Sequence, residues 1–505
     1  MKNLWILVCV IALLSLSSCD FFNYLQEDGN VYDDPQGNFW ANDFRTNKSY
    51  RLRAELLAEG MHCNVWVEKG SASSAQARHV AYEYDNKIYQ MMIDNFSIKD
   101  FSITEKMWGE KKTFADIMQF ADWLADGDGK LNILLLDIRD NYRKGVNESF
   151  LAGYFWSGDF TNDINSNRKA MIYIDTKPGM DKIEEAFKTL AHEMQHLMNF
   201  STSLIIRFTE AENKINFHWM DTWVDEGLAS AAEYLYSGHS IDKINWFINN
   251  GREGNSSVKG LIDRGNNFFV WGNREGTGVN QSQYALLDDY STVYLFFQWL
   301  RVQAGHISIY RDIIASPYSD HRAVTTVMNS AVSGHGFSSW VVLLRTWHAA
   351  NFINASSGIY GYRGDPELSK IIVPAPPSIN TSISLAPGEG VYSSFTANSS
   401  MPLPSQNNIR YASLSKTGTE FSETLAASGR TLLTYNANLS RSGNSENGAT
   451  TGNPIASVNM DSPARSVMPE TLGPYRIDAG DFISRRQFIP IYPERLLARN
   501  RDNHE

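Results

Sequence analysis

His192-Glu193-Met194-Gln195-His196 lies within residues 181–200, where the spacing of apolar side chains predicts one continuous helix. Residues four apart project from the same face of a helix, so both histidine rings can bind a single zinc ion. Glu193 lies beside them and can act as general base toward a water molecule at the metal. The opposite face is apolar and should anchor the helix in the core, through Phe187, Leu190, Ala191, Met194 and Met198. The motif predicts a zinc hydrolase site, and two histidines flanking an unrelated glutamate are the alternative.

A catalytic zinc ion needs a third protein ligand and leaves one position for water. A histidine ligand six residues after His196 is excluded, because Thr202 stands there. The next predicted helix, over 222–236, carries Glu226, and Glu233 lies on the same face seven residues later. Glu226 is therefore the leading candidate for the third ligand, and Glu233 is a candidate to orient a ligand histidine, with an exposed helix carboxylate as the alternative for Glu233. Weaker candidates for the third ligand are Glu210, Glu212 and Asp225.

Together these two motifs resemble those of the gluzincin metallopeptidases. H-E-M-Q-H-L-M-N at 192–199 and W-V-D-E-G-L-A at 223–229 are most similar to the hyicolysin family of bacterial secreted neutral metallopeptidases, and the second motif also resembles a helix of the zinc aminopeptidases. The similarity covers roughly 126–305. It implies a thermolysin-like zinc endopeptidase that hydrolyses peptide bonds with a metal-activated water. The implied ligands are His192, His196 and Glu226, and the implied base is Glu193.

The sequence departs from the thermolysin pattern four residues after the predicted third ligand. Ser230 stands there in place of a carboxylate. This departure leaves open which residue orients the ligand histidine, and it does not affect the predicted metal site itself.

Peptide hydrolysis builds negative charge on the carbonyl oxygen, so a hydrogen-bond donor is needed at that position. Tyr290 is the candidate, because it is predicted to open a helix over 290–304, and the catalytic tyrosine of the aminopeptidases similarly precedes a helix at a comparable distance. Tyr294 lies one turn later and could be confused with it. Packing in the core is the alternative role for Tyr290.

The G-x-M-E-N signature, by which aminopeptidases hold a free amino terminus, is absent from the sequence, and Gly60–Asn64 is only distantly similar to it. An endopeptidase acting on proteins or peptides is therefore favoured. A zinc exopeptidase and a non-catalytic envelope lipoprotein, an adhesin or scaffold on a peptidase fold, remain as alternatives.

The amino-terminal residues predict a lipoprotein signal peptide. The apolar run Leu4–Leu14 follows Lys2 and is shorter than the roughly 20 residues needed to span a bilayer. It leads into Leu16-Ser-Ser-Cys19, which is typical of a bacterial lipoprotein box with cleavage before Cys19. We expect loss of 1–18, a palmitate-containing lipid on Cys19, and a tether over 19–38. The protein would then be anchored in the bacterial cell envelope, periplasmic or surface-exposed; an ordinary secretory signal is the alternative.

Composition excludes other classes of protein. The chain has 505 residues, a formal net charge of −11 and 43% hydrophobic residues, so neither a disordered protein nor a nucleic-acid-binding one is expected. Of the three cysteines, Cys9 belongs to the leader and Cys19 to the anchor. Cys63 is left as a small core residue, and no internal disulfide is expected.

The expected fold is α+β: a thermolysin-like zincin catalytic body, with a mixed sheet followed by a helical half, and a small β-rich C-terminal domain. The expected limits are an N-terminal β-rich region at 39–125, the catalytic domain at 126–371, and the C-terminal domain at 379–505 after a proline-rich stretch. Residues 49–100 favour strands, and the apolar run 131–138 a central strand.

Two further features were assigned from local pattern. Met171–Asp175 is expected to be the edge strand above the cleft that aligns an extended peptide substrate. The acidic turn Asp126-Gly-Asp-Gly-Lys130 offers oxygen ligands for calcium. It lacks the glutamate at the twelfth position of an EF-hand loop, so a turn entering the next strand is favoured.

Overall fold

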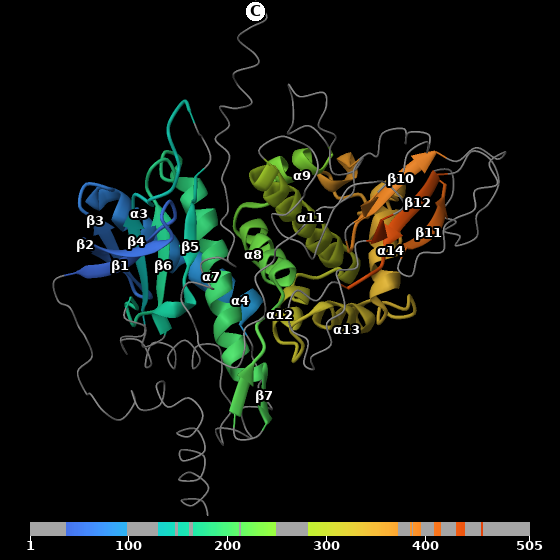
Figure 1. The fold of residues 1–505 in the computed structure, drawn as a ribbon, viewed down its shortest axis with the longest axis horizontal. Coiled ribbons are helices and arrows are strands. Elements are labelled where there is room, and N and C mark those ends of the chain that lie inside the picture. The colour runs from blue at the N-terminus through green and yellow to red at the C-terminus, as the bar shows by residue number, and fades with distance from the viewer. Residues whose placement is uncertain are drawn as a thin grey trace, which may run out of the picture.

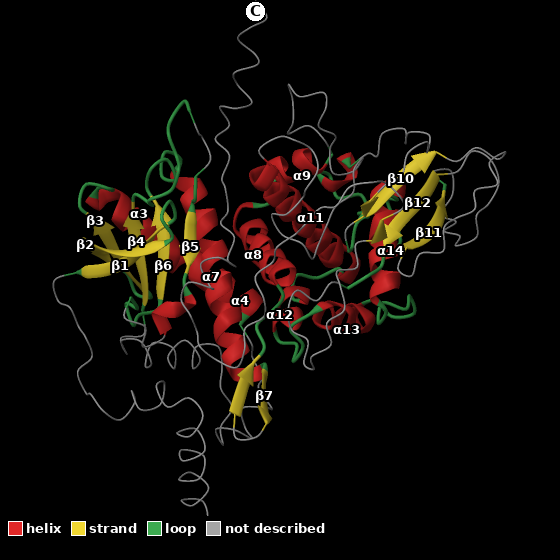
Figure 2. Cartoon of the chain, viewed as in Figure 1, coloured by secondary structure: helices red, strands yellow, loops and turns green. Residues whose placement is uncertain are grey.

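The computed structural model describes residues 37–97, 130–146, 150–160, 165–211, 214–248, 281–371, 384–385, 387–394, 409–415, 431–439 and 456–457. Within them the protein has a mixed sheet on one side of a long central helix, α7 (Ile183–Ile206), and a helical half on the other (Figures 1 and 2). The α+β class is confirmed. The signal peptide with Cys9, Cys19 and nearly all of the tether, and the acidic residues of the 126–130 turn lie outside the described residues.

Six strands form the main sheet in the order β1-β2-β3-β4-β6-β5. Their bounds are Asn38–Asp43 for β1, Lys48–Glu59 for β2, Cys63–Glu68 for β3, Leu131–Leu136 for β4, Met171–Asp175 for β6 and Gly153–Phe155 for β5. The three strands β3, β4 and β6 are parallel, and the other pairings are antiparallel. Every residue of β4 is buried, as expected of a strand that is apolar except for Asn132 and is covered on both faces. The sheet thus joins strands from both sides of residue 126, and the predicted domain limits stay predictions.

The prediction that Met171–Asp175 is the edge strand is wrong. This strand, β6, pairs with β4 on one side and with β5 on the other, and β5 is the edge strand. All five residues of β6 are buried, which is typical of an interior strand. Strand order depends on pairing across the sheet, and a three-residue strand such as β5 is too short to show a period-two pattern.

The prediction of strands throughout 49–100 is correct only for its first half. Two helices follow the strands, α3 (Ser74–Glu83) and α4 (Tyr89–Phe96), joined by a π-helical turn at Tyr84–Ile88. A capping box begins α3, because the Ser73 hydroxyl accepts a hydrogen bond from the Gln76 backbone N–H while the Gln76 side chain accepts one from Ser73. The buried side of these helices is apolar and packs into the main core.

Among the described residues, the helical half contains α8 (Thr222–Ser237), α9 (Ile241–Phe247), α11 (Gln281–Ala304), α12 (Ile309–Ile314), α13 (His321–Ala331) and α14 (Trp340–Ile353). A hairpin of β7 (Phe208–Ala211) and β8 (Lys214–Phe217) connects α7 to α8, and two 3-10 turns lie at Ser157–Phe160 and Leu368–Lys370. The prediction that Tyr290 opens a helix is wrong, because α11 begins at Gln281 and Tyr290 lies inside it. Within the described residues, no helix has the length and apolar character needed to span a membrane.

A separate three-stranded antiparallel sheet follows α14 in the chain. Its order is β10 (Gly390–Ser394), β12 (Thr431–Asn436) and β11 (Ile409–Leu414), and a two-stranded pair joins β9 (Ser384–Leu385) to β13 (Ala456–Ser457). The sheet lies beside α14 (Figure 1). Cys63, in β3 of the main sheet, is buried, and burial raises the pKa of its thiol to about 12, so its predicted place in the core is confirmed.

Candidate metal centre

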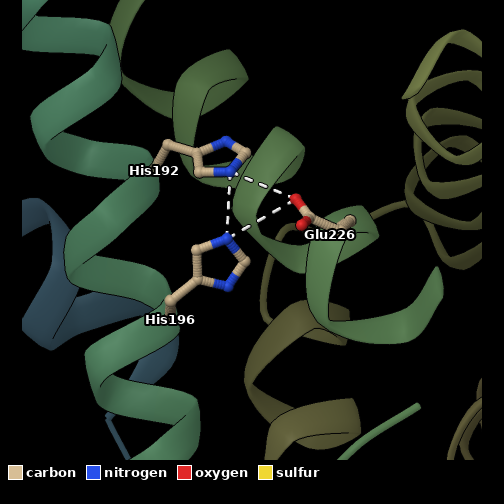
Figure 3. A group of neighbouring side chains, drawn as sticks. All are labelled: His192, His196 and Glu226. Atoms are coloured by element: carbon tan, nitrogen blue, oxygen red, sulfur yellow. Dashed lines mark hydrogen bonds and ion pairs between the residues drawn. The ribbon is translucent and has the colours of Figure 1, made fainter. Parts of the chain in front are cut away.

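Three side chains from two helices meet beside the central helix (Figure 3). His192 and His196 of α7 place their Nε2 atoms 3.0 Å apart. Glu226 of α8 places Oε2 3.2 Å from the first of these nitrogens and 3.5 Å from the second. Ligands about 2.1 Å from a tetrahedral ion lie about 3.4 Å from one another, so this triangle fits zinc. In the described part of the chain it is the one such group of three.

The electrostatics of this group favour a positive charge at its centre. Burial lowers the pKa of His192, but hydrogen bonds to Glu226 and Glu233 outweigh burial and raise it. Burial likewise opposes charge on His196, and the nearby Asp225 and Glu226 raise its pKa well above the ordinary value. For Glu226, burial raises the pKa, while His196 and His192 lower it below its ordinary value. A buried carboxylate facing two imidazoles is thus suited to hold a divalent cation.

Each imidazole also has a carboxylate on its outer nitrogen. Glu233 Oε1 lies 2.6 Å from His192 Nδ1, and Asp225 Oδ2 lies 3.1 Å from His196 Nδ1. A carboxylate on Nδ1 fixes the ring so that Nε2 is left for the metal. The sequence predicts Glu233 for this position, whereas Asp225 is predicted only as a weaker candidate for the third ligand. The available signal was its place directly before Glu226, since consecutive helical residues point about 100° apart and can reach different sides of one ring.

Tyr290 reaches the site from the middle of α11. Its ring centroid lies 6.4 Å from that of His192, and its hydroxyl lies close enough to the Glu226 carboxylate for the two groups to interact. Burial raises the pKa of Tyr290 well above 10, and the charges of Glu226 and Glu193 raise it further, so the hydroxyl stays protonated at neutral pH. The neighbouring Tyr294 is committed elsewhere, since its hydroxyl accepts a hydrogen bond from the Ser240 backbone N–H at 2.9 Å.

The remaining predicted residues occupy different positions. Glu193 is buried beside the ligands on α7 and is close enough for its charge to act on Tyr290. Ser230 is buried, and its hydroxyl accepts a hydrogen bond from Lys243 Nζ at 3.3 Å. Glu212 lies outside the described residues, and Glu210 belongs to β7, whose side chains are not described.

Comparison with known proteins agrees with this site. The chain is 28% identical over 341 residues to the neutral metalloprotease ShpI of Staphylococcus hyicus. The resemblance to the bacterial neutral metallopeptidases is thereby confirmed. The alignment covers 66% of this chain and 66% of the relative, slightly less than two thirds of each, and it is longer than the stretch of about 180 residues over which the motifs were recognised. No protein-family model matches the chain.

Proposed function

We propose that this protein is a zinc-dependent endopeptidase of thermolysin-like fold, attached to the bacterial cell envelope by a lipid on Cys19. The triangle of His192, His196 and Glu226 carries the proposal, because its spacing suits zinc and its surroundings favour a cation. Similarity to a neutral metalloprotease supports peptide-bond hydrolysis as the reaction. The missing aminopeptidase signature supports cleavage within a chain over removal of its first residue.

Each residue of the site has a definite part in this chemistry. When bound by the three ligands, zinc supplies a Lewis acid that polarises the peptide carbonyl and lowers the pKa of water. Glu193 accepts a proton from the attacking water and delivers it to the leaving amine. The Tyr290 hydroxyl donates a hydrogen bond to the carbonyl oxygen as negative charge develops there. Glu233 and Asp225 hold the two imidazoles in the required orientation.

The edge strand β5 is the element best placed to align a substrate. Among the described residues it pairs only with β6, and it lies against α7 one turn before the zinc motif. The contact is close, since a Cβ on Gly153 would lie 2.7 Å from the Thr189 methyl group. An extended peptide added to β5 by strand pairing would run past Glu193 and the ligands.

The test is proteolysis measured beside zinc content in the parent and in Glu193→Gln. The parent should bind about one zinc ion, digest casein, lose this activity with a chelator and regain it when zinc is returned. Glu193→Gln should keep zinc and lose roughly 10³-fold in kcat, because the amide cannot accept the proton. Digestion by Glu193→Gln at the parental rate would show that the assigned base is wrong.

Two further measurements separate the alternatives. Cleavage of N-terminally acetylated peptides would exclude an aminopeptidase. If the protein bound zinc but cleaved no peptide, the result would favour the non-catalytic envelope lipoprotein. Labelling with palmitate and recovery in the membrane fraction should both occur in the parent and disappear in Cys19→Ala. A parent protein that takes up no label would contradict the lipid anchor and leave the metal site unaffected.

A further inference from the structure

We propose that Lys243 and Arg207 are positioning residues of the metal centre, each holding one ligand histidine through its own chain of hydrogen bonds and ion pairs. Neither residue belongs to a motif that identifies the site. The inference rests on the metal site of the proposed function and concerns residues beyond the ligands and the carboxylates that touch them.

The first chain supports His192. Its outer carboxylate, Glu233, directs Oε1 to the ring, and Oε2 lies 2.7 Å from the ammonium group of Lys243 in α9. The side chains of Glu233 and Lys243 are only 13% and 14% exposed. An ionised carboxylate at such depth is costly unless it is paired and hydrogen-bonded, and the lysine supplies the pairing charge. Ser230, at the position where the thermolysin pattern has a carboxylate, instead accepts a hydrogen bond from Lys243.

The second chain supports His196. Asp225 directs Oδ2 to the ring, and its Oδ1 accepts a hydrogen bond of 2.6 Å from the side-chain amide of Asn199. The side-chain oxygen of Asn199, Oδ1, in turn accepts one of 2.6 Å from Arg207 Nη2. A guanidinium group can only donate, so it fixes the amide with its oxygen toward Arg207 and its NH₂ toward Asp225. If the Asn199 amide were reversed, its NH₂ group would face the donors of Arg207 and its oxygen would face the Asp225 carboxylate.

Arg207 is itself held by parts of the fold outside the site. It is 1% exposed, and Nη1 donates to the carbonyl oxygens of Ile314 at 2.7 Å and Ser316 at 3.2 Å, at the end of α12. Its Nε donates to the Ser203 hydroxyl at 3.0 Å. The direction of the second chain is therefore set where α7 meets the helical half, about three turns beyond His196.

The two chains share no residue, yet each has the same plan: an imidazole, a carboxylate, and a cation that holds the carboxylate directly or through an amide. Outer contacts of this kind orient metal ligands, and their loss commonly weakens metal binding 10- to 100-fold. Lys243 and Arg207 should therefore affect zinc affinity although neither touches the ligand atoms.

The experiment compares zinc dissociation constants, by competition with a chelator, in four variants of the full chain. Lys243→Met removes the charge and keeps the length, and Lys243→Arg restores the charge. Asn199→Asp keeps an acceptor for Arg207 but removes the donor to Asp225, and avoids deleting a buried guanidinium that supports backbone carbonyls. Lys188→Met is the matched control, since Lys188 pairs with Glu185 at 2.7 Å on α7, in an ion pair that does not involve the ligands.

We expect Lys243→Met and Asn199→Asp to bind zinc 10- to 100-fold more weakly, Lys243→Arg to recover most of the affinity, and Lys188→Met to match the parent. With cobalt(II) in place of zinc, the visible absorption should shift in Lys243→Met and return in Lys243→Arg. Zinc binding within twofold of the parent in both Lys243→Met and Asn199→Asp would overturn the inference alone. A parent protein that binds no zinc would overturn the proposed function and the inference with it.

Discussion

The Tyr290 hydroxyl interacts with the ligand Glu226, and its contribution to catalysis can be measured by removing one oxygen atom. Tyr290→Phe should lower kcat by about 10²- to 10³-fold, because one donor to the developing oxyanion is lost, while KM and zinc content stay near the parental values. The measurement is steady-state hydrolysis of a fluorogenic peptide, with zinc content determined on the same samples.

Tyr294→Phe is the matched control one turn along the same helix. The Tyr294 hydroxyl is hydrogen-bonded to the Ser240 backbone N–H and to the His239 ring. The variant should therefore lose about 1 kcal/mol of stability and keep its kcat. A larger fall in kcat for Tyr294→Phe than for Tyr290→Phe would reverse the assignment of the two tyrosines.

At this scale the ligands and Glu233 could be predicted, whereas the residues that support His196 could not. His192 and His196 are adjacent on a helix face by virtue of their spacing, and Glu226 follows within a recognisable motif. The contacts that link His196 through Asp225 and Asn199 to Arg207 join two helices. Arg207 then donates to a backbone carbonyl at the end of a third helix. No local spacing specifies such contacts, which depend on how the helices pack.

Gly227 sets how closely α8 approaches α11. A Cβ at this position would overlap the ring of Phe297, which is fully buried against the Trp223 and Tyr310 rings. In an open helix Gly→Ala stabilises by about 1 kcal/mol, whereas overpacking costs about 1–3 kcal/mol. We expect Gly227→Ala to lower the free energy of unfolding, measured in urea, and to weaken zinc binding because Glu226 is the adjacent residue.

The exposed end of the same helix provides the control. Ser237→Ala should change the free energy of unfolding by less than about 0.5 kcal/mol. If Gly227→Ala were instead more stable than the parent, the glycine would not be required by the contact between α8 and α11.

Helices and strands were predicted best where the periodic pattern of apolar residues extends over many residues. The predicted helix over 222–236 matches α8 to within one residue at each end, and the helix predicted over 181–200 corresponds to α7, which ends six residues later. The predictions were wrong for short elements. The helices α3 and α4 span 10 and 8 residues, and the strands predicted in front of them were extended into this region. The capping box at Ser73 was a usable signal for α3. The order of β5 and β6 in the sheet could not be predicted from the sequence pattern, because the edge strand is determined by which strands pair.

For the molecule as a whole, composition and motif order indicated a sheet followed by a helical half, and the structure agrees. What the sequence does not show is how the C-terminal sheet meets that helical half. The Tyr392 hydroxyl donates to the His348 carbonyl oxygen at 2.6 Å, and His348 Nε2 lies 3.1 Å from the Gly388 carbonyl oxygen. These contacts join residues about 40 positions apart, and nothing around His348 in the sequence marks it.

This junction predicts a specific pH dependence of stability. Burial lowers the pKa of His348 to about 4 from its ordinary 6.5. Between these two values the unfolded chain binds a proton that the folded one does not, so stability is full above pH 6.5 and falls as the pH drops toward 4. A difference of about 2.5 pKa units corresponds to roughly 3 kcal/mol.

We expect His348→Gln, which keeps a donor for Gly388 and cannot titrate, to lose less stability than the parent between pH 6.5 and 4.5. Urea unfolding at several pH values, followed by circular dichroism and by the fluorescence of Trp347 and its neighbours, measures this difference. His335→Gln is the control, because His335 is exposed and should leave the parental pH dependence unchanged. Equal losses in the parent and in His348→Gln would mean that this buried imidazole does not govern how the C-terminal sheet stays attached to α14.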